Sequence, residues 1–296
     1  MSHNRLWPSL LVLIGVLSSA SCSSGFEGHT HGEGVAAFPA PVAAGELVRV
    51  KRVYDGDTIL LEDGRKVRYL GINAPEFQEP FYLKAKRSNE SLVMGREIRL
   101  EFDQERTDSY GRVLAYVYAG NEMVNARLVQ EGLAHAFFIG PNRKHHSLLL
   151  RLQAEAQQRK VGIWSGRVRD LKITTVHPAD STQDDQYPSY VRIANLSNTT
   201  IKLAGYVLSN EGGQRCLFPD VSMDPGYTVI VSSGSGTDGV AAKGQLVVHW
   251  STQGPVWDPS EDTAFLTDPN GNLEDRFHYK GKRVRRSAPR SKSKAR

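Results

Sequence analysis

The sequence has little cysteine and few long apolar runs. Among its 296 residues, cysteine occurs only as Cys22 and Cys216. The one long apolar run, Leu6–Leu17, has about a dozen residues, which is too short for an ordinary transmembrane helix. If Cys22 carries a lipid, no disulfide can form within the chain, so the fold must depend on its hydrophobic cores. We therefore expect Cys216 to be a small buried apolar side chain, and we expect no membrane-spanning segment after processing.

The N-terminal residues have the pattern of a signal peptide over residues 1–21, because Arg5 precedes the apolar run and small residues follow it. Cleavage after Ala20 would release a soluble protein. Cleavage just before Cys22 would leave a lipid-modified cysteine, as in bacterial lipoproteins, although Ser19 stands where their pattern usually has leucine. Both alternatives predict export, with the protein either secreted or held at the cell envelope by a lipid on Cys22.

The net charge of +5 comes from one end of the chain. Residues 280–296 contain nine Lys and Arg and no Asp or Glu, so the remainder carries −4. Such a run is often a solvated, disordered tail, and it is also the kind of segment that attaches to nucleic acid or another anionic partner. Hydrophobic residues make up 40% of the chain, which is ordinary for a globular protein.

Residues 22–45 are rich in Gly, Ala, Ser and Pro and are typical of a flexible tether. From residue 46 to residue 166, strand patterns come first and helical patterns follow, which favours a small barrel covered by helices. The expected strands are Leu47–Tyr54, Thr58–Leu61, Lys66–Ile72, Glu97–Phe102, Val113–Tyr118 and Met123–Val124. The expected helices are Phe81–Met94, Asn125–Gln130 and Ser147–Lys160.

Residues 171–279 have a different pattern, in which short strand-like runs are separated by Pro, Gly, Asn and Asp. This spacing predicts a second domain, an antiparallel β-sandwich. The runs are Tyr190–Ala194, Thr200–Leu208, Tyr227–Ser232, Gln245–Trp250, Thr263–Thr267 and Leu273–Tyr279. The whole chain is therefore expected to be mainly β.

Three short strings in the first domain contain the side chains that phosphodiester cleavage needs: YDGDT (Tyr54–Thr58), VRYLGINAPE (Val67–Glu76) and RTDSYGR (Arg106–Arg112). Taken singly, each charged residue has an ordinary explanation as a turn, surface or helix-start residue. Together they supply carboxylates for a metal and a water proton, and two guanidiniums for a phosphate whose negative charge increases during the reaction.

These strings, with Glu101–Ala134 and the closing QRKVGIWS (Gln158–Ser165), resemble the staphylococcal nuclease (thermonuclease) family. The resemblance covers about residues 46–166. It implies an OB-type five-stranded β-barrel with helices, and calcium-dependent hydrolysis of DNA and RNA with little base preference.

The resemblance also implies a metal site with one Ca²⁺ ion. By position, Asp57 would be one ligand, Asn73 a second, and the backbone carbonyl of Ala74 a third. The family prototype has Asp where this chain has Asn73. An amide oxygen can still bind Ca²⁺, but one negative charge is lost, so we expect weaker calcium binding and retained chemistry.

The same positional match implies the catalytic roles. Arg68 and Arg112 would bind the scissile phosphate and stabilise the transition state, and Glu76 would position or deprotonate the attacking water.

Tyr110 stands where the family often has an aromatic residue near the nucleotide. Phe137 and Phe138 stand where the family has the tyrosines that stack on the nucleotide. At least one of the two phenylalanines is expected to pack in the core.

The second domain resembles a lamin-tail domain through Tyr190–Gly213, Leu217–Gly236 and Trp250–Tyr279. That family implies a small immunoglobulin-like antiparallel β-sandwich that serves as a binding or positioning module, so residues 171–279 are expected to bind a cell-envelope or protein partner. The sequence shows no set of catalytic residues in this domain. Trp250 and Trp257 are expected to pack in its core or its loops.

Two alternatives remain open. The barrel could be a nucleic-acid or protein binding module that has lost catalysis, since OB-type barrels bind single strands without cutting them. The presence of Arg68, Glu76 and Arg112 argues against this alternative, and only Asn73 favours it. Alternatively, the sandwich could be the main functional part of an adhesive surface protein.

Overall fold

The fold is described from a computed structural model, which describes residues 45–166, 169–178, 189–252 and 255–281. All of these residues belong to one compact unit, Phe38–Arg296. The predicted signal peptide with Cys22, nearly all of the predicted tether and most of the predicted basic tail lie outside the described residues. No helix in the described part of the chain is long and apolar enough to cross a membrane.

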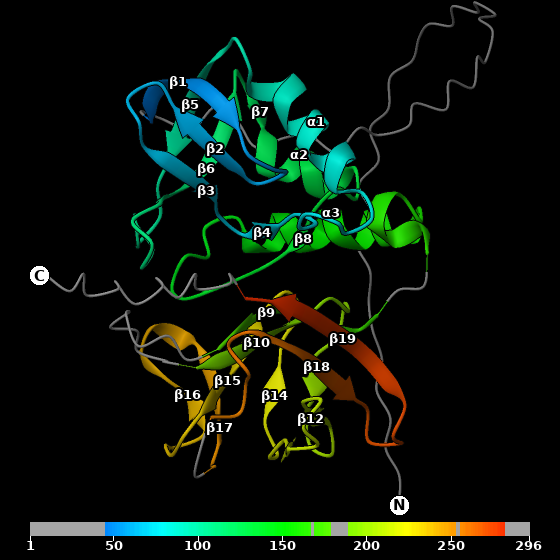
Figure 1. Cartoon of the computed structure of the whole chain (residues 1–296). Coiled ribbons are helices and arrows are strands. Elements are labelled where there is room, and N and C mark those ends of the chain that lie inside the picture. Colours follow the sequence, from blue (N-terminus) through cyan, green and yellow to red (C-terminus); the bar gives the residue numbers. More distant parts are fainter. Residues whose placement is uncertain (1–44, 167–168, 179–188, 253–254, 282–296) are drawn as a thin grey trace, which may run out of the picture. The chain divides into compact units, whose positions relative to one another are not determined.

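The first half of the described chain forms a closed five-stranded barrel (Figure 1). The strand order is β3-β2-β1-β5-β6, and a parallel pairing of β3 with β6 closes the barrel, while β7 extends the sheet beyond β6. The expectation of a mainly β fold with an OB-type barrel is confirmed. The strands are β1 (Glu46–Val53), β2 (Thr58–Leu61), β3 (Lys66–Tyr69), β5 (Glu97–Glu101), β6 (Val113–Ala119) and β7 (Glu122–Met123).

The barrel closes around apolar side chains that alternate along its strands, as the sequence pattern predicts. In β2 and β5 the side chains of Ile59, Leu61, Ile98 and Leu100 are all fully buried. The β2–β3 hairpin turns at Gly64, whose φ of 90° lies in the region that favours glycine.

Three helices pack on the barrel: α1 (Tyr82–Val93), α2 (Val124–Gln130) and α3 (His146–Gln158). α2 contacts α1, α3 and β6. On α3 the buried residues Leu149, Leu152 and Ala156 recur at helical spacing and form the apolar face that the sequence predicts. Between the helices, β4 (Ile72–Asn73) pairs with β8 (His135–Ala136), and the barrel segment ends in the short helix η1 (Gly162–Ser165).

The second half of the chain contains two main sheets, as expected for a sandwich. One has the order β16-β17-β15-β10-β9, the other β13-β12-β18-β19, and β11 with β14 forms a small third sheet. The elements are β9 (Leu171–His177), β10 (Tyr190–Asn195), β11 (Ile201–Lys202), β12 (Val207–Ser209), β13 (Arg215–Leu217), β14 (Ser222–Met223), β15 (Thr228–Ser233), β16 (Gly239–Val240), η2 (Ala242–Gly244), β17 (Leu246–Trp250), β18 (Glu261–Thr267) and β19 (Leu273–Lys280).

The sandwich differs from the sequence pattern in several details, since β9, β13, β14 and β16 are not among the expected runs. The run Thr200–Leu208 is divided into β11 and β12, and Gly205, with φ of 87°, lies between them. β15 and β17 pair in parallel, whereas the other strand pairs of the sandwich are antiparallel. The parallel pair arises because the chain passes through β16 and η2 before β17 begins.

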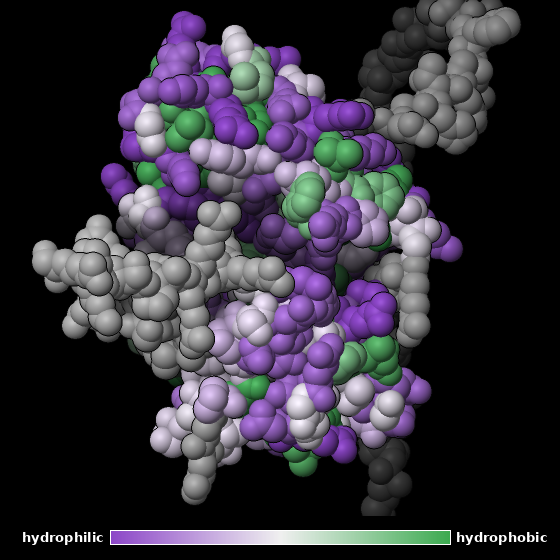
Figure 2. Space-filling model, viewed as in Figure 1, coloured by the Kyte–Doolittle hydropathy of each residue, from purple (hydrophilic) through white to green (hydrophobic). Residues whose placement is uncertain are grey.

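The sandwich core contains the side chains that the sequence assigns to it. Trp250, Trp257 and Cys216 are 5%, 2% and 6% exposed, so both tryptophans and the thiol are buried. On the face of the molecule shown in Figure 2, hydrophobic residues are scattered among hydrophilic ones.

Candidate active site

The turn between β1 and β2 holds Asp57 against the segment that follows β4. Asp57 is 5% exposed. Its Oδ2 accepts the backbone N–H of Ala74 at 2.7 Å, and its Oδ1 accepts the Thr58 hydroxyl at 3.0 Å. The Asp57 N–H in turn donates to Asp55 Oδ1 at 3.0 Å. These bonds fix one carboxylate at the point where two chain segments meet.

Arg68 on β3 lies over the same point. Its Nη1 donates to the carbonyls of Tyr69 and Ile72 at 2.6 and 2.8 Å, and its Nη2 donates to Asn73 Oδ1 at 2.8 Å. Its Nε lies 3.3 Å from Asp57 Oδ1. One guanidinium therefore contacts both side chains that the sequence assigns to a metal.

Negative charge is crowded around this guanidinium. Burial and the neighbouring Asp57 carboxylate raise the pKa of Asp55 to about 6. Desolvation, and then the charges of Asp57 and Asp55, raise the pKa of Glu76, while Arg68 lowers it. The negative charges of Asp55, Asp57 and Glu76 therefore repel one another, and a bound cation would reduce this repulsion.

The residues present fit a calcium ion. Asp57 and Asn73 supply side-chain oxygens, and Ala74 supplies a carbonyl, and oxygen is the ligand atom that Ca²⁺ prefers. Because one Arg68 guanidinium reaches both side-chain oxygens, those oxygens lie close together. Within the described ranges no group of three or more His, Cys, Asp and Glu side chains could hold a metal.

A second guanidinium comes from the loop before β6. Asp108 holds Arg112 in place: its Oδ2 lies 2.7 Å from the side-chain Nε, and its Oδ1 accepts the Arg112 backbone N–H at 2.9 Å. The guanidinium carbon of Arg112 lies 5.5 Å from the centre of the Tyr110 ring. Gly111, with φ of 72°, lets the loop turn between them.

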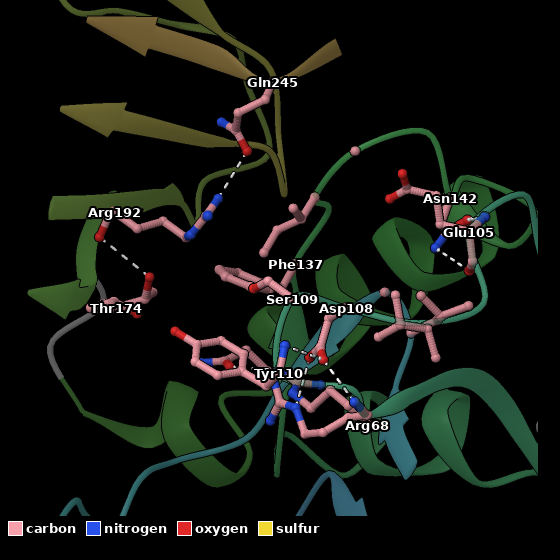
Figure 3. A pocket seen from close by; sticks show the side chains of 18 of the residues that line it. Arg68, Glu105, Asp108, Ser109, Tyr110, Phe137, Asn142, Thr174, Arg192 and Gln245 are labelled. Atoms are coloured by element: carbon pink, nitrogen blue, oxygen red, sulfur yellow. Dashed lines mark hydrogen bonds and ion pairs between the residues drawn. The ribbon is translucent and has the colours of Figure 1, made fainter. Parts of the chain in front are cut away.

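The two guanidiniums, Glu76 and the aromatic residues share a pocket of about 480 Å³ (Figure 3). Of the residues that the sequence assigns to the site, the pocket is lined by Arg68, Asn73, Glu76, Tyr110, Arg112 and Phe137. Asp57 and Ala74 are buried beside this lining.

Phe138 does not line the pocket. It is 2% exposed, and its ring packs against His146 and Tyr227, with centroids 4.3 and 5.6 Å away. Phe137 and the next residue but one, Ile139, line the pocket instead. Alternation along an extended segment explains the difference, because neighbouring side chains point in opposite directions.

Sequence reasoning did not assign the remaining lining residues to the site, among them Asp108, Thr174, Arg192 and Gln245. Asp108 could have been found, since it stands four residues before Arg112 with opposite charge. The other three come from the second half of the chain, and no local signal relates them to the barrel.

Comparison with known proteins identifies both halves of the chain. A family model described as Staphylococcal nuclease homologue matches residues 66–166, and one described as Lamin Tail Domain matches residues 165–281. Thermonuclease of Staphylococcus intermedius is 42% identical over 129 residues, which cover 40% of this chain and 77% of that protein.

Two further relatives match over 129 residues as well. Thermonuclease of Staphylococcus hyicus is 39% identical, with 40% of this chain and 76% of that protein covered. Endonuclease YncB of Bacillus subtilis (strain 168) is also 39% identical, with 40% of this chain and 61% of that protein covered. The chain therefore belongs to the staphylococcal nuclease family, and its second half contains a lamin tail domain.

Proposed function

We propose that this protein is an exported, calcium-dependent nuclease that hydrolyses phosphodiester bonds of DNA and RNA with little base specificity. Relatives named thermonuclease and endonuclease support the nuclease activity. The observation that carries the proposal is the shared pocket, in which Arg68, Arg112 and Glu76 line one space beside the buried Asp57.

In the proposed reaction, Arg68 and Arg112 donate hydrogen bonds to the oxygens of the scissile phosphate. Their charge offsets the negative charge that increases when water adds to phosphorus. Asp108 fixes Arg112, and the carbonyls of Tyr69 and Ile72 fix Arg68, so both guanidiniums are oriented before substrate arrives. Because the two guanidiniums are already oriented, no free energy is needed to order them in the transition state.

Glu76 accepts a proton from the attacking water as the water oxygen bonds to phosphorus, while the P–O bond to the leaving nucleotide oxygen breaks and that oxygen takes up a proton from solvent. The raised pKa of Glu76 suits this role, because a carboxylate with a higher pKa is a stronger base near neutral pH. Asp57, Asn73 and the Ala74 carbonyl would hold the calcium ion, which would supply positive charge next to the phosphate and the water.

Low base specificity is expected from the side chains around the site. Tyr110 is 58% exposed, and Phe137 lines the same pocket. An aromatic face can stack on any base, so such contacts hold a nucleotide without reading its identity.

Export and the role of the second domain complete the proposal. The signal-peptide pattern of residues 1–21 supports export, with Cys22 as the lipid attachment point if the protein is anchored. We assign to the lamin tail domain a positioning role, in which residues 171–279 bind a cell-envelope or protein partner.

The test is digestion of single- and double-stranded DNA and RNA by the purified mature chain, with Ca²⁺ and with a chelator. We expect cleavage only with Ca²⁺. Arg68→Ala, Arg112→Ala and Glu76→Gln should each reduce the turnover number about 10²–10³-fold, because each removes a preorganised charge or the base.

Arg215→Ala, which removes an exposed arginine on β13 of the sandwich, is the control and should retain full turnover. Circular dichroism would establish that each variant is folded. Near-normal turnover in a folded Arg112→Ala variant would remove Arg112 from the mechanism, and intact polynucleotide with saturating Ca²⁺ would refute the function.

A further inference from the structure

One wall of the catalytic pocket comes from the lamin tail domain. Thr174, Arg192 and Gln245 belong to this domain, and Figure 3 shows them in the same pocket as Arg68 and Tyr110 of the barrel. Strand residues and the loop before β17 provide this wall. A positioning module that acted at a distance would not need to line the site of reaction.

Arg192 is held in a fixed position on this wall. Its Nη1 donates to Gln245 Oε1 at 2.8 Å and to Thr228 Oγ1 at 3.1 Å. Gln245 is itself fixed, because its Nε2 donates to the carbonyls of Thr228 and Leu246, both at 2.9 Å. A guanidinium that is already ordered loses less conformational freedom when it binds an anion.

A second cation, Lys243 of η2, lines the pocket where barrel and sandwich residues meet. Its ammonium group forms an ion pair with Glu105 of the barrel. The Lys243 side chain is 67% exposed, so the pair contributes little to stability and its ammonium group can exchange partners.

The pocket therefore carries cations on both walls, with Arg68 and Arg112 from the barrel and Arg192 and Lys243 from the sandwich. A ligand that contacts both walls must have negative charge at more than one place. A polynucleotide strand has this chemistry, because its phosphates repeat along the backbone. At about 480 Å³ the pocket falls in the range that encloses ligands of small-molecule size. That space suits a nucleotide of a single strand better than a stiff duplex.

We propose that Arg192 and Lys243 bind the backbone phosphate next to the scissile one, so that the lamin tail domain forms part of the substrate cleft. This inference rests on the proposed nuclease function. The other explanation for Arg192 is a purely structural one, in which it only joins β10 to the loop before β17.

The experiment uses the full mature chain and the variants Arg192→Gln, Lys243→Gln and the control Arg215→Gln, with a dinucleotide and a hexanucleotide as substrates in matched DNA and RNA forms. For the hexanucleotide we expect each pocket variant to lower kcat/KM about tenfold, as loss of a charged hydrogen bond would do. The loss should be smaller for the dinucleotide, which has one phosphodiester. The control should behave like the natural chain on both.

Salt dependence gives an independent measurement. The binding of a hexanucleotide in the presence of chelator, measured by fluorescence anisotropy, should weaken with salt in the natural chain. The slope of log K against log [salt] should become less steep by about 0.7 for each lost phosphate contact. Thermal melting would show how far each variant is destabilised. Lys243→Gln alters an exposed side chain and keeps the test valid if Arg192→Gln does not fold.

The outcomes separate this inference from the function on which it rests. Suppose that the natural chain cleaves polynucleotides, and that both pocket variants have its kcat/KM values for the dinucleotide and the hexanucleotide and its salt slope for binding. The sandwich subsite is then refuted and the nuclease function stands. If the pocket variants lower kcat/KM by the same factor for the dinucleotide and the hexanucleotide, the purely structural explanation of Arg192 is supported and the subsite is refuted. If the natural chain cleaves nothing, the nuclease function itself fails.

Discussion

At the scale of single residues, Asn73 sets the charge of the proposed calcium site. Its Oδ1 accepts a hydrogen bond from Arg68, and its neighbour across the β4–β8 ladder is His135. An amide oxygen binds a cation through its dipole alone, whereas a carboxylate adds a full negative charge. The affinity of the site for calcium should therefore be limited by this one residue.

We expect Asn73→Asp to bind Ca²⁺ about tenfold more tightly, since calcium affinity rises with the number of charged ligands. Isothermal titration calorimetry of the full mature chain would measure the dissociation constant without relying on activity. Asn121→Asp is the control, because it adds the same charge at an exposed turn between β6 and β7. A dissociation constant that is unchanged in Asn73→Asp would exclude residue 73 from the ligand set.

At the scale of elements, the β1–β2 turn depends on a glycine that has no room for a side chain. A Cβ at Gly56 would lie 2.5 Å from the Ala74 Cβ and 2.8 Å from the Ala85 Cβ. The turn thus packs directly on the segment after β4 and on α1. This close approach explains how Asp57 reaches the Ala74 N–H.

Gly56→Ala should therefore separate these elements, lower the free energy of unfolding by about 1–3 kcal/mol, and weaken calcium binding. Urea denaturation and calorimetry would measure the two effects. Gly166→Ala is a suitable control, because a Cβ there meets nothing within 4 Å and the backbone φ is negative. Full stability and calcium binding in Gly56→Ala would show that the turn can move without cost.

The extent to which elements could be predicted differs between the two domains. In the barrel, apolar strand patterns and turn signals predict β1, β2, β5 and β6 within a residue or two. In the sandwich, the seven-residue strand β9 was not predicted, and neither were β13, β14 and β16, whose two or three residues are too few to show a periodicity. The parallel β15–β17 pair also depends on a long connection, which sequence pattern does not encode.

The same limit applies to the site. The barrel residues with expected roles in the reaction come from contiguous motifs, so sequence identifies them, whereas Arg192 and Gln245 join the pocket only through the packing of the two domains. The opposite holds for Phe138. Its motif position predicts a nucleotide contact, but its side chain lies in the core. Motifs therefore predict the chemistry, and tertiary contacts decide which side chains can reach the substrate.

At the scale of the whole described molecule, the barrel and the sandwich are joined by buried hydrogen bonds. Gln153 of α3 is fully buried; its Oε1 accepts the Ala136 N–H at 2.7 Å, and its Nε2 donates to the Leu196 carbonyl at 3.1 Å. The Phe138 N–H donates to the Gly226 carbonyl at 2.8 Å. Contacts of this kind couple the stability of one domain to that of the other.

We expect the mature chain to unfold in one calorimetric transition, and Gln153→Met to shift that whole transition to lower temperature. The substitution keeps the volume of the side chain but leaves the buried Ala136 N–H without its acceptor, at a cost of about 1–3 kcal/mol. Gln158→Met, on the exposed face of the same helix, should change stability by less than about 0.5 kcal/mol. Two separate transitions, with only one of them shifted by Gln153→Met, would show that the domains unfold independently. In that case the sandwich wall of the pocket would be able to separate from the barrel. Arg192 would then contact substrate only while the two domains are packed together.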